Sequence, residues 1–349
     1  MRKVLLISGV GALLLAATAL IATQTPWGQN VLLKRLISAR LLDAPIAWGD
    51  PEVLRVFVCG SASPLGVSER AQSCIVVTAG STFFIVDAGA GSTGNLLRAR
   101  LPMQSLAGVL LTHFHSDHIS ALGDTNLVSW VAGRTVPLNV FGPHGVARVV
   151  DGFNEAYALD RTYRSTHHGV ELLRPDIGPM RSQLVVTEQF FEVGEFKVTP
   201  FSVDHGPVQP ALGYRFDYRG RSVVISGDTN ALQSTAVASR DADLLIHDAL
   251  SEPLVQAMKD AVTSAGNVRM AQIIDDILDY HAHTDTLVEV AREAGVAMLA
   301  LYHLVPVPAN SIAKSIFVRG LPADVQIVDD GTVFNLPTKT DTIEVVHIF

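Results

Sequence analysis

The stretch that decides the fold is LLTHFHSDH, which covers residues 110–118 and follows an apolar run. Four side chains that can bind a metal ion fall within six residues of this stretch: His113, His115, Asp117 and His118. In an extended chain His113 and His115 point to the same side, because side chains alternate along a strand. Imidazole nitrogen and carboxylate oxygen are donors that suit zinc. The stretch therefore predicts a metal site at the end of a buried strand.

Further segments carry His or Asp at the ends of apolar runs. They are FIVDAG at residues 84–89, VDH at 203–205, SGDT at 226–229 and LALYH at 299–303. We predict strands at residues 54–58, 74–77, 82–86, 108–111, 138–140, 184–186, 196–201, 214–218, 222–225, 244–246, 298–301 and 325–328. We predict helices at residues 94–100, 117–130, 146–158, 267–279 and 286–294. This alternation indicates an α/β fold with helices layered on sheets.

In this order the segments resemble the motifs of the metallo-β-lactamase superfamily, from about residue 55 to residue 306. Within it, the sequence looks most like the ribonuclease Z and arylsulfatase-like branch, because GYR at residues 213–215 and GRSVVISGDT at 220–229 are similar to its central block. The segment LIHDA at residues 245–249 resembles the His-Glu-Ala of that branch, with Asp248 in place of glutamate. The resemblance implies an αββα sandwich, in which two mixed sheets are flanked by helices.

The resemblance also implies two zinc ions per chain. One ion would be held by His113, His115 and His205, the other by Asp117, His118 and His303, and both by Asp228. Mn²⁺ or Fe²⁺ could occupy the same donors. Seven protein ligands leave coordination positions open, as in catalytic rather than structural sites. A hydroxide bridging the ions would attack the ester, and Asp117 counts among the catalytic residues.

A proton donor for the leaving group follows from the same resemblance, with two candidate histidines. The family's spacing to the Ala-Gly-Val before the last strand matches His281, which lies 13 residues before Ala294, and not His283, which lies 11 before it. We therefore expect His281 to act on the leaving oxygen and Asp248 to orient it. Asp87 is expected to support the ligand loop by hydrogen bonding rather than to bind metal.

Composition bears on the substrate. The 349 residues carry 26 Lys and Arg against 34 Asp and Glu, a net charge of −8. An acidic chain argues against nucleic acid, whose binding depends on Lys and Arg contacts to phosphate. We therefore expect a small-molecule anionic ester as substrate, a sulfate ester or a phosphodiester, cleaved in an arylsulfatase-like reaction, and no nucleic-acid partner. The alternatives are a ribonuclease Z-like nuclease or phosphodiesterase, a lactonase and, outside the enzymes, an inactive membrane-anchored scaffold.

The N-terminal segment indicates export. Arg2 and Lys3 precede an uncharged apolar run over residues 4–22, close to the roughly 20 residues that cross a bilayer as a helix. A basic flank keeps the N-terminus in the cytoplasm and directs the rest outward. We predict a signal peptide or membrane anchor over residues 1–24, a linker with an amphipathic helix over 25–50 and a hydrolase domain over 51–349. The domain would lie in the periplasm, anchored to the inner membrane or released. The sequence does not decide whether the protein forms a homo-oligomer.

The chain contains two cysteines, Cys59 and Cys74. Cys59 ends one predicted strand and Cys74 begins another, so neighbouring strands could bring them together. An oxidising compartment permits a disulfide between them, and two buried free thiols are the alternative. With 48% apolar and 17% charged residues, the chain is not of the disordered class, which is poor in apolar residues and rich in charge.

Overall fold

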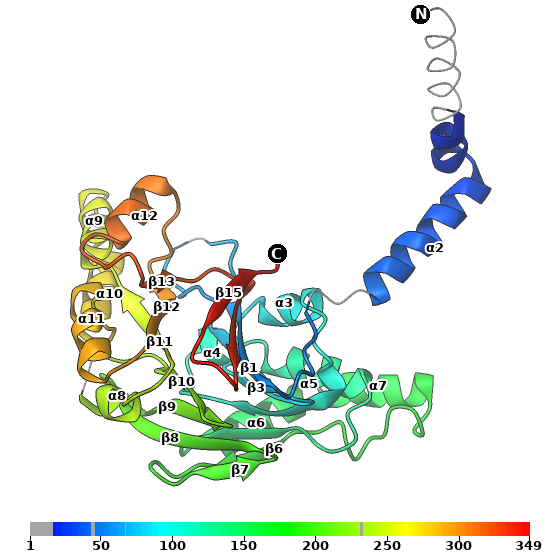
Figure 1. Ribbon diagram of the computed structural model, residues 1–349, viewed down its shortest axis with the longest axis horizontal. Coiled ribbons are helices and arrows are strands. Elements are labelled where there is room, and N and C mark those ends of the chain that lie inside the picture. The colour runs from blue at the N-terminus through cyan, green and yellow to red at the C-terminus, as the bar shows by residue number, and fades with distance from the viewer. Residues whose placement is uncertain (1–16, 43–45, 67, 231–232) are drawn as a thin grey trace, which may run out of the picture. The chain divides into compact units, whose positions relative to one another are not determined.

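The computed structural model describes residues 17–42, 46–66, 68–230 and 233–349 (Figure 1). The chain divides into two compact units, residues 1–47 and residues 48–349. In the first unit residues 17–24 are helical, and helix α2 (Pro26–Leu42) follows. Apolar residues are spread around α2 instead of gathering on one face, so it is not the amphipathic helix that we expected. Of the described helices, none is long and apolar enough to span a bilayer. Residues 1–16 of the predicted signal peptide or anchor fall outside the description.

Two mixed sheets form the second unit, as predicted. The strand order is β15-β14-β1-β2-β3-β4-β5-β6 in the first sheet and β13-β12-β11-β10-β9-β8-β7 in the second. The first sheet contains β1 (Val53–Gly60), β2 (Cys74–Ala79), β3 (Thr82–Val86), β4 (Leu106–Leu110), β5 (Asn139–Gly142), β6 (Arg181–Leu184), β14 (Thr332–Pro337) and β15 (Glu344–His347). The second contains β7 (Phe191–Val193), β8 (Phe196–His205), β9 (Val208–Tyr218), β10 (Arg221–Ile225), β11 (Leu244–Leu250), β12 (Met298–Val305) and β13 (Gln326–Ile327). Strands β3 to β6 run parallel, as do β10 to β13, and the other neighbours pair antiparallel.

Helices flank the two sheets (Figure 1). Those between strands of the first sheet are α3 (Ser92–Arg98), the 3₁₀ turn η1 (Met103–Ser105), α4 (Ser116–Ile119), α5 (Leu122–Val131), α6 (Val146–Ala156) and α7 (Ala158–His168). Those between strands of the second are α8 (Gln233–Ala238), α9 (Glu252–Ser264), α10 (Val268–Asp276), the 3₁₀ turn η2 (Ile277–Asp279), α11 (Thr284–Glu293) and α12 (Ser311–Phe317). Leu287 of α11 and Phe317 of α12 pack on Leu245 and neighbouring side chains of the second sheet.

The main core lies between the sheets. Val56, Val77 and Phe84 of the first sheet belong to one buried cluster with Phe216 and Val223 of the second. Strands that are covered on both faces read as nearly continuous apolar runs, which explains why the sequence signals them clearly. Each fully buried side chain of this kind contributes about 1.5–3 kcal/mol, so this layer holds the sandwich together.

Strand ends from both sheets place the polar residues at one edge of this sandwich. The ligand loop follows β4, Asp228 follows β10, and Asp248 and His303 lie near the ends of β11 and β12. His205 is the last residue of β8. Ligands of open α/β sheets bind at the carboxyl ends of the parallel strands. The fold thus brings together donors that are far apart in the sequence.

The structure differs from the predicted helices and strands where hydrogen bonds to distant segments decide the local conformation. The helix predicted over residues 117–130 is two helices, α4 and α5. The chain bends between them because Ala121 donates its N–H to the Ala88 carbonyl and Ala88 donates to the His118 carbonyl, at 2.8 and 2.7 Å. Strands β7, β14 and β15 and helices α7, α8, α9 and α12 were not predicted. Strand β15 (EVVH) has only two apolar residues, and it is extended because it pairs with β14.

Cys59 and Cys74 form a disulfide, with their Cα atoms 5.0 Å apart. Strands β1 and β2 are antiparallel neighbours, and Gly60 lies opposite Cys74. Both cysteines are fully buried. Of the two alternatives for these cysteines, the structure has the disulfide, and the bond closes a loop over residues 60–73.

Candidate metal centre

The first group of donors consists of His113, His115 and His205. The loop after β4 carries two of them, and the end of β8 carries the third. His115 Nδ1 lies 3.0 Å from His113 Nε2 and 3.3 Å from His205 Nε2. Burial lowers the pKa of His113 well below its usual range and also lowers the pKa of His115 and His205. These imidazoles are therefore neutral, which is the form that binds metal.

The second group consists of Asp117, His118, Asp228 and His303, all buried. Asp117 Oδ2 lies 3.1 Å from His303 Nε2 and 3.4 Å from His118 Nε2. Burial alone would raise the pKa of Asp117 and Asp228, but the neighbouring His118 and His303 hold the pKa of both carboxyls below the usual range. The two carboxylates are therefore charged and can act as ligands.

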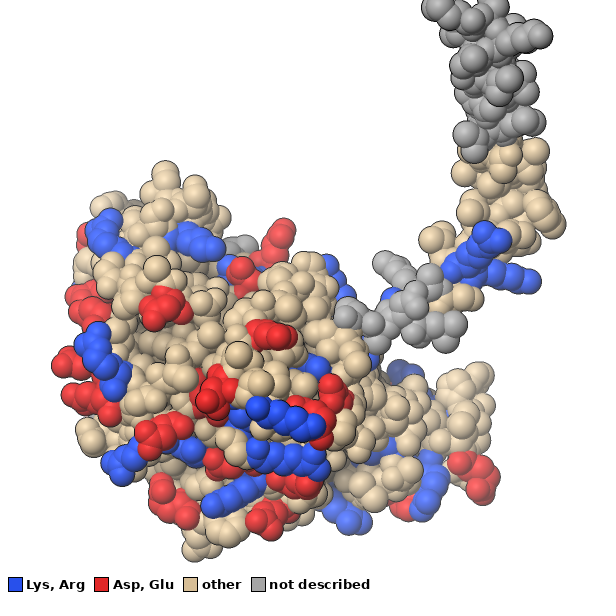
Figure 2. Space-filling model, in the orientation of Figure 1, with Lys and Arg blue, Asp and Glu red and all other residues tan. Residues whose placement is uncertain are grey.

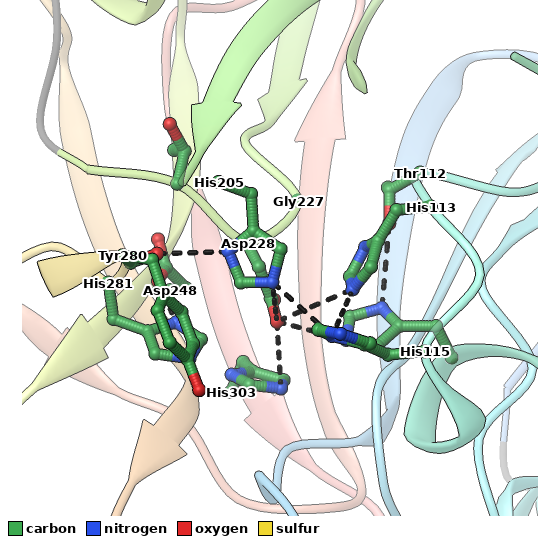
Figure 3. A network of polar contacts seen from close by, with 12 residues as sticks. Thr112, His113, His115, His205, Gly227, Asp228, Asp248, Tyr280, His281 and His303 are labelled. Carbon is green, nitrogen blue, oxygen red and sulfur yellow. Dashed lines mark hydrogen bonds and ion pairs between the residues drawn. The ribbon is translucent and has the colours of Figure 1, made fainter. Parts of the chain in front are cut away.

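Asp228 connects the two groups (Figure 3). Its Oδ2 lies 3.1 Å from His118 Nε2 and 3.3 Å from His303 Nε2 in the second group. The same oxygen lies 3.9 Å from His113 Nε2 and from His205 Nε2 in the first. Asp228 Oδ1 is buried and has no hydrogen-bond partner among the described residues, an arrangement that costs stability unless a cation compensates it. This convergence of lone pairs and an unpaired carboxylate oxygen fits a metal site.

Gly227 allows the turn that presents Asp228. Its φ is +66°, a conformation that side chains rarely adopt. A Cβ atom at this position would lie 2.5 Å from the Leu212 carbonyl oxygen. Only glycine fits here, because any other residue would meet both the strain and the clash.

Contacts behind the donors fix the orientation of the histidine rings. Asp87 Oδ2 lies 2.8 Å from His118 Nδ1, and Asp87 also accepts hydrogen bonds from the Thr112 N–H and hydroxyl, at 2.9 and 2.8 Å. His205 Nδ1 lies 2.9 Å from the Tyr280 carbonyl oxygen. When Nδ1 donates in this way, Nε2 is left with its lone pair toward the site. Asp87 thus supports the ligand loop and lies outside the donor groups, as expected.

The two residues predicted for proton transfer lie together beside the donors. His281 Nδ1 is 2.9 Å from Asp248 Oδ2. Burial would raise the pKa of Asp248, but hydrogen bonds with His247 and His281 hold it below its usual value. His281 lines the cavity at the donors. His283 instead lies 3.1 Å from the Leu278 carbonyl oxygen and 3.5 Å from Glu252, so the spacing argument selected the histidine that reaches the cavity.

The cavity has a wall that the sequence did not reveal. Ser63, Pro64 and Leu65 line one side of it, and Ile277 and Tyr280 are also in its lining. The Ser63 hydroxyl donates to the Leu304 carbonyl at 2.7 Å, which ties the wall to β12. A usable signal was present: the wall belongs to the segment between the two cysteines and follows a buried strand.

Comparison with known proteins places this geometry in a family. The model of the beta-lactamase superfamily domain matches residues 82–304. A protein named ribonuclease Z from Mycolicibacterium gilvum is 33% identical over 257 residues, covering 73% of this chain and 85% of the relative. A protein of the same name from Mycobacterium bovis is 34% identical over 264 residues, covering 73% and 87%. The chain belongs to the metallo-β-lactamase superfamily, in its ribonuclease Z branch, and is a metal-dependent hydrolase.

Solved structures agree on the fold. The metallo-β-lactamase fold protein YhfI from Bacillus subtilis matches with a TM-score of 0.60 at 20% identity, covering 81% of this chain and 99% of that one. The short form of human tRNase Z matches with a TM-score of 0.55 at 18% identity, covering 80% and 98%. The predicted αββα sandwich is therefore confirmed.

The prediction that excluded nucleic acid is wrong, because the relatives that match 73% of this chain are named ribonuclease Z. The exclusion relied on the predicted export of the chain, on the lack of a basic arm over residues 151–181, where acidic residues accompany the arginines, and on the net charge of −8. The charge sum covers the whole chain, and Figure 2 shows acidic and basic side chains interspersed on the face in view. It also omits bound metal ions, which are the largest local charges in sites of this kind. Net charge therefore does not describe the field where a phosphate would bind.

Proposed function

We propose that the protein is a phosphodiesterase that hydrolyses RNA with two metal ions, zinc by preference. The observation that carries this proposal is the position of Asp228 Oδ2, within 3.9 Å of ring nitrogens from both donor groups. One carboxylate shared between two groups is the arrangement expected for paired ions. The named ribonuclease Z relatives favour a phosphodiester of RNA over a sulfate ester or a lactone.

The chain would hold one ion with His113, His115 and His205 and the other with Asp117, His118 and His303, with Asp228 shared. Such ions, when bound, polarise phosphoryl oxygens and lower the pKa of water. The first group is built from neutral histidines, whereas the second contains the carboxylate of Asp117. The chain therefore offers two different environments around one shared oxygen.

The residues around the donors would guide the leaving group. Hydrolysis joins the oxygen of water to phosphorus and breaks the bond from phosphorus to the leaving oxygen, which then needs a proton. His281 Nε2 is available to supply that proton, because Nδ1 is engaged by Asp248 Oδ2 at 2.9 Å. The buried Asp248 carboxylate would orient the ring through this contact. A positioned acid of this kind contributes about 10²–10⁴-fold to the rate.

The experiment is direct. Zinc-loaded protein is incubated with a tRNA precursor and with an unstructured RNA, and the products are separated by size. We expect cleavage of RNA, its loss after treatment with a chelator, and its return when zinc is restored. Metal-loaded protein that leaves both RNAs intact but hydrolyses nitrophenyl sulfate or a lactone would refute the proposal and identify the other ester as substrate.

We also propose that the protein works in an oxidising compartment, reached through the N-terminal apolar segment as a signal or anchor. The buried disulfide between Cys59 and Cys74 supports this proposal, because such bonds are rare where thiols are kept reduced. Cells would be fractionated in the presence of an alkylating reagent, and the two cysteines followed by mass spectrometry. Alkylated Cys59 and Cys74 in a soluble cytoplasmic fraction would contradict the assignment.

A further inference from the structure

The cavity at the donors has two chemically different halves. One half carries the polar side chains already described: His115, Asp117, Asp228, His281 and His303. The other half, which we call the apolar half, consists of Pro64, Leu65, Ile277 and Val305. No lysine or arginine is among the described residues that line the cavity. A group that lies on the apolar half therefore meets no charged side chain there.

Packing between three separate segments holds the apolar half in place. Leu65 comes from the loop after β1, Ile277 from η2 and Val305 from the end of β12. Leu65 and Ile277 pack against a buried cluster that includes Val305 and Ile274. The Ser63 hydroxyl, which donates to the β12 backbone at 2.7 Å, fixes the loop that carries Leu65. The apolar half is therefore a preformed surface, as binding sites for small groups usually are.

Tyr280 adds an aromatic ring to the same cavity. The centroid of this ring lies 4.9 Å from that of His281 and 5.0 Å from that of His205 (Figure 3). The backbone is fixed as well, because the Tyr280 carbonyl oxygen lies 2.9 Å from His205 Nδ1. The side chain is partly exposed, and it belongs to the cavity lining. A flat aromatic surface therefore borders the place where the ester would bind.

The size of the cavity limits how much of a substrate can enter. Its volume is about 240 Å³, below the roughly 300–1,000 Å³ of pockets that enclose a whole drug-sized ligand. It therefore has room for the scissile phosphate and for one group attached to it. A group that matches the apolar half and the Tyr280 ring is neutral, flat and largely apolar on its faces. Nucleobases meet these requirements, and they stack on aromatic side chains with little dependence on sequence.

We propose that the apolar half and Tyr280 form a subsite for one nucleobase, that of a nucleotide adjoining the scissile phosphate. This inference rests on the proposed function for the class of substrate, RNA, and adds the part of the substrate that the cavity selects. The metal donors act on the phosphate, whereas Leu65, Ile277 and Tyr280 hold the base. Because the base is held through its faces, the subsite distinguishes a nucleotide with a base from one without and accepts different sequences.

The test removes one base at a time from the substrate. The cleaved bond is first mapped in a short unstructured RNA with zinc-loaded protein, and the nucleotide on each side of that bond is then replaced by an abasic ribose. We expect kcat/KM for one of the two abasic RNAs to fall by about 5- to 150-fold, the range for loss of one base stacked on an aromatic ring. The other abasic RNA should be cleaved almost as well as the intact RNA.

Variants at Tyr280 connect this loss to the subsite. Tyr280→Leu should lower kcat/KM on intact RNA by a similar factor and leave cleavage of the sensitive abasic RNA unchanged, because enzyme and substrate then lack the same contact. Tyr280→Phe keeps the ring and should retain the preference for intact RNA. Metal content per chain, measured for each variant, should equal that of the wild type.

Two isoleucines one turn apart provide a matched pair of variants. Ile277 lines the cavity, whereas Ile273 is 43% exposed and is not among the residues that line it. Ile277→Ala should reduce the preference for intact over abasic RNA, and Ile273→Ala should leave that preference unchanged. Melting temperatures of both variants show whether the packing of α10 and η2 is retained.

Equal cleavage of the intact RNA and both abasic RNAs would overturn the subsite and leave the proposed function standing. A Tyr280→Leu variant that loses the same factor on intact and abasic RNA would likewise overturn it, because the ring would then act on the metal site and not on a base. Wild-type protein with two ions that hydrolyses bis(p-nitrophenyl) phosphate but no RNA would refute the RNA substrate and this inference together.

Discussion

Replacing Asp228 with alanine tests the central feature of the site. Its Oδ2 lies 3.1 and 3.3 Å from ring nitrogens of one donor group and 3.9 Å from two of the other. Zinc binding by four protein ligands is worth about 10–16 kcal/mol, so one ligand accounts for about 2.5–4 kcal/mol, or about 10²–10³-fold in affinity. Because Asp228 reaches both groups, we expect Asp228→Ala to weaken both ions by that factor and to abolish turnover in parallel.

The measurement is metal content per chain after dialysis against a chelator buffer of fixed free zinc, alongside turnover of bis(p-nitrophenyl) phosphate. Asp228→Asn, which keeps the shape of the side chain, controls for misfolding and should weaken the ions in the same direction. Asp176→Ala is the matched control, since this carboxylate pairs with Arg174 at a largely exposed site, where ion pairs contribute little. Two ions retained at wild-type affinity in Asp228→Ala would refute the shared-ligand reasoning.

Three other changes have defined outcomes. His281→Ala should keep its metal content and lose about 10²–10⁴-fold in kcat on substrates with basic leaving groups, whereas His283→Ala should stay active. An active His281→Ala variant beside an inactive His283→Ala variant would show that sequence spacing selected the wrong histidine. Cys59→Ser combined with Cys74→Ser should lower the unfolding free energy by about 3 kcal/mol, the value for a disulfide that closes a loop of about 15 residues. Urea-induced unfolding measures this as a lower midpoint concentration at an unchanged dependence on urea. An unchanged midpoint would mean that the bond does not stabilise the domain. Gly227→Ala should lose soluble protein or metal content, because its Cβ would lie 2.5 Å from a carbonyl oxygen; wild-type zinc binding by this variant would show that the turn is not required.

The sequence allowed most of the metal site to be predicted because its donors are local or end strongly apolar runs. His113, His115, Asp117 and His118 lie within one loop, and the distant donors each follow a buried strand. Their positions in the fold follow from sheet order, which periodicity does not encode. The resemblance to a known family supplied that order.

What escaped prediction depends on tertiary contacts. The wall at Ser63 and Leu65 has no polar motif, and the bend at Ala121 arises from a hydrogen bond to Ala88. The exclusion of RNA failed because a sum over charges contains no information about their arrangement.

The disulfide at the base of the 60–73 loop has a practical consequence for any biochemical study. That loop carries the Ser63–Leu65 side of the cavity. A covalent bond, between Cys59 and Cys74, holds its base, and hydrogen bonds hold it as well: the Asp330 carboxylate accepts from the Ser61 and Ala71 N–H groups at 3.0 and 2.7 Å, and the Ser63 hydroxyl donates to the Leu304 carbonyl at 2.7 Å. Reduction of the disulfide would remove the covalent bond and leave the hydrogen bonds. Activities of the oxidised and the reduced protein therefore describe two chemically different enzymes, and the oxidised one is the appropriate reference for substrate selection.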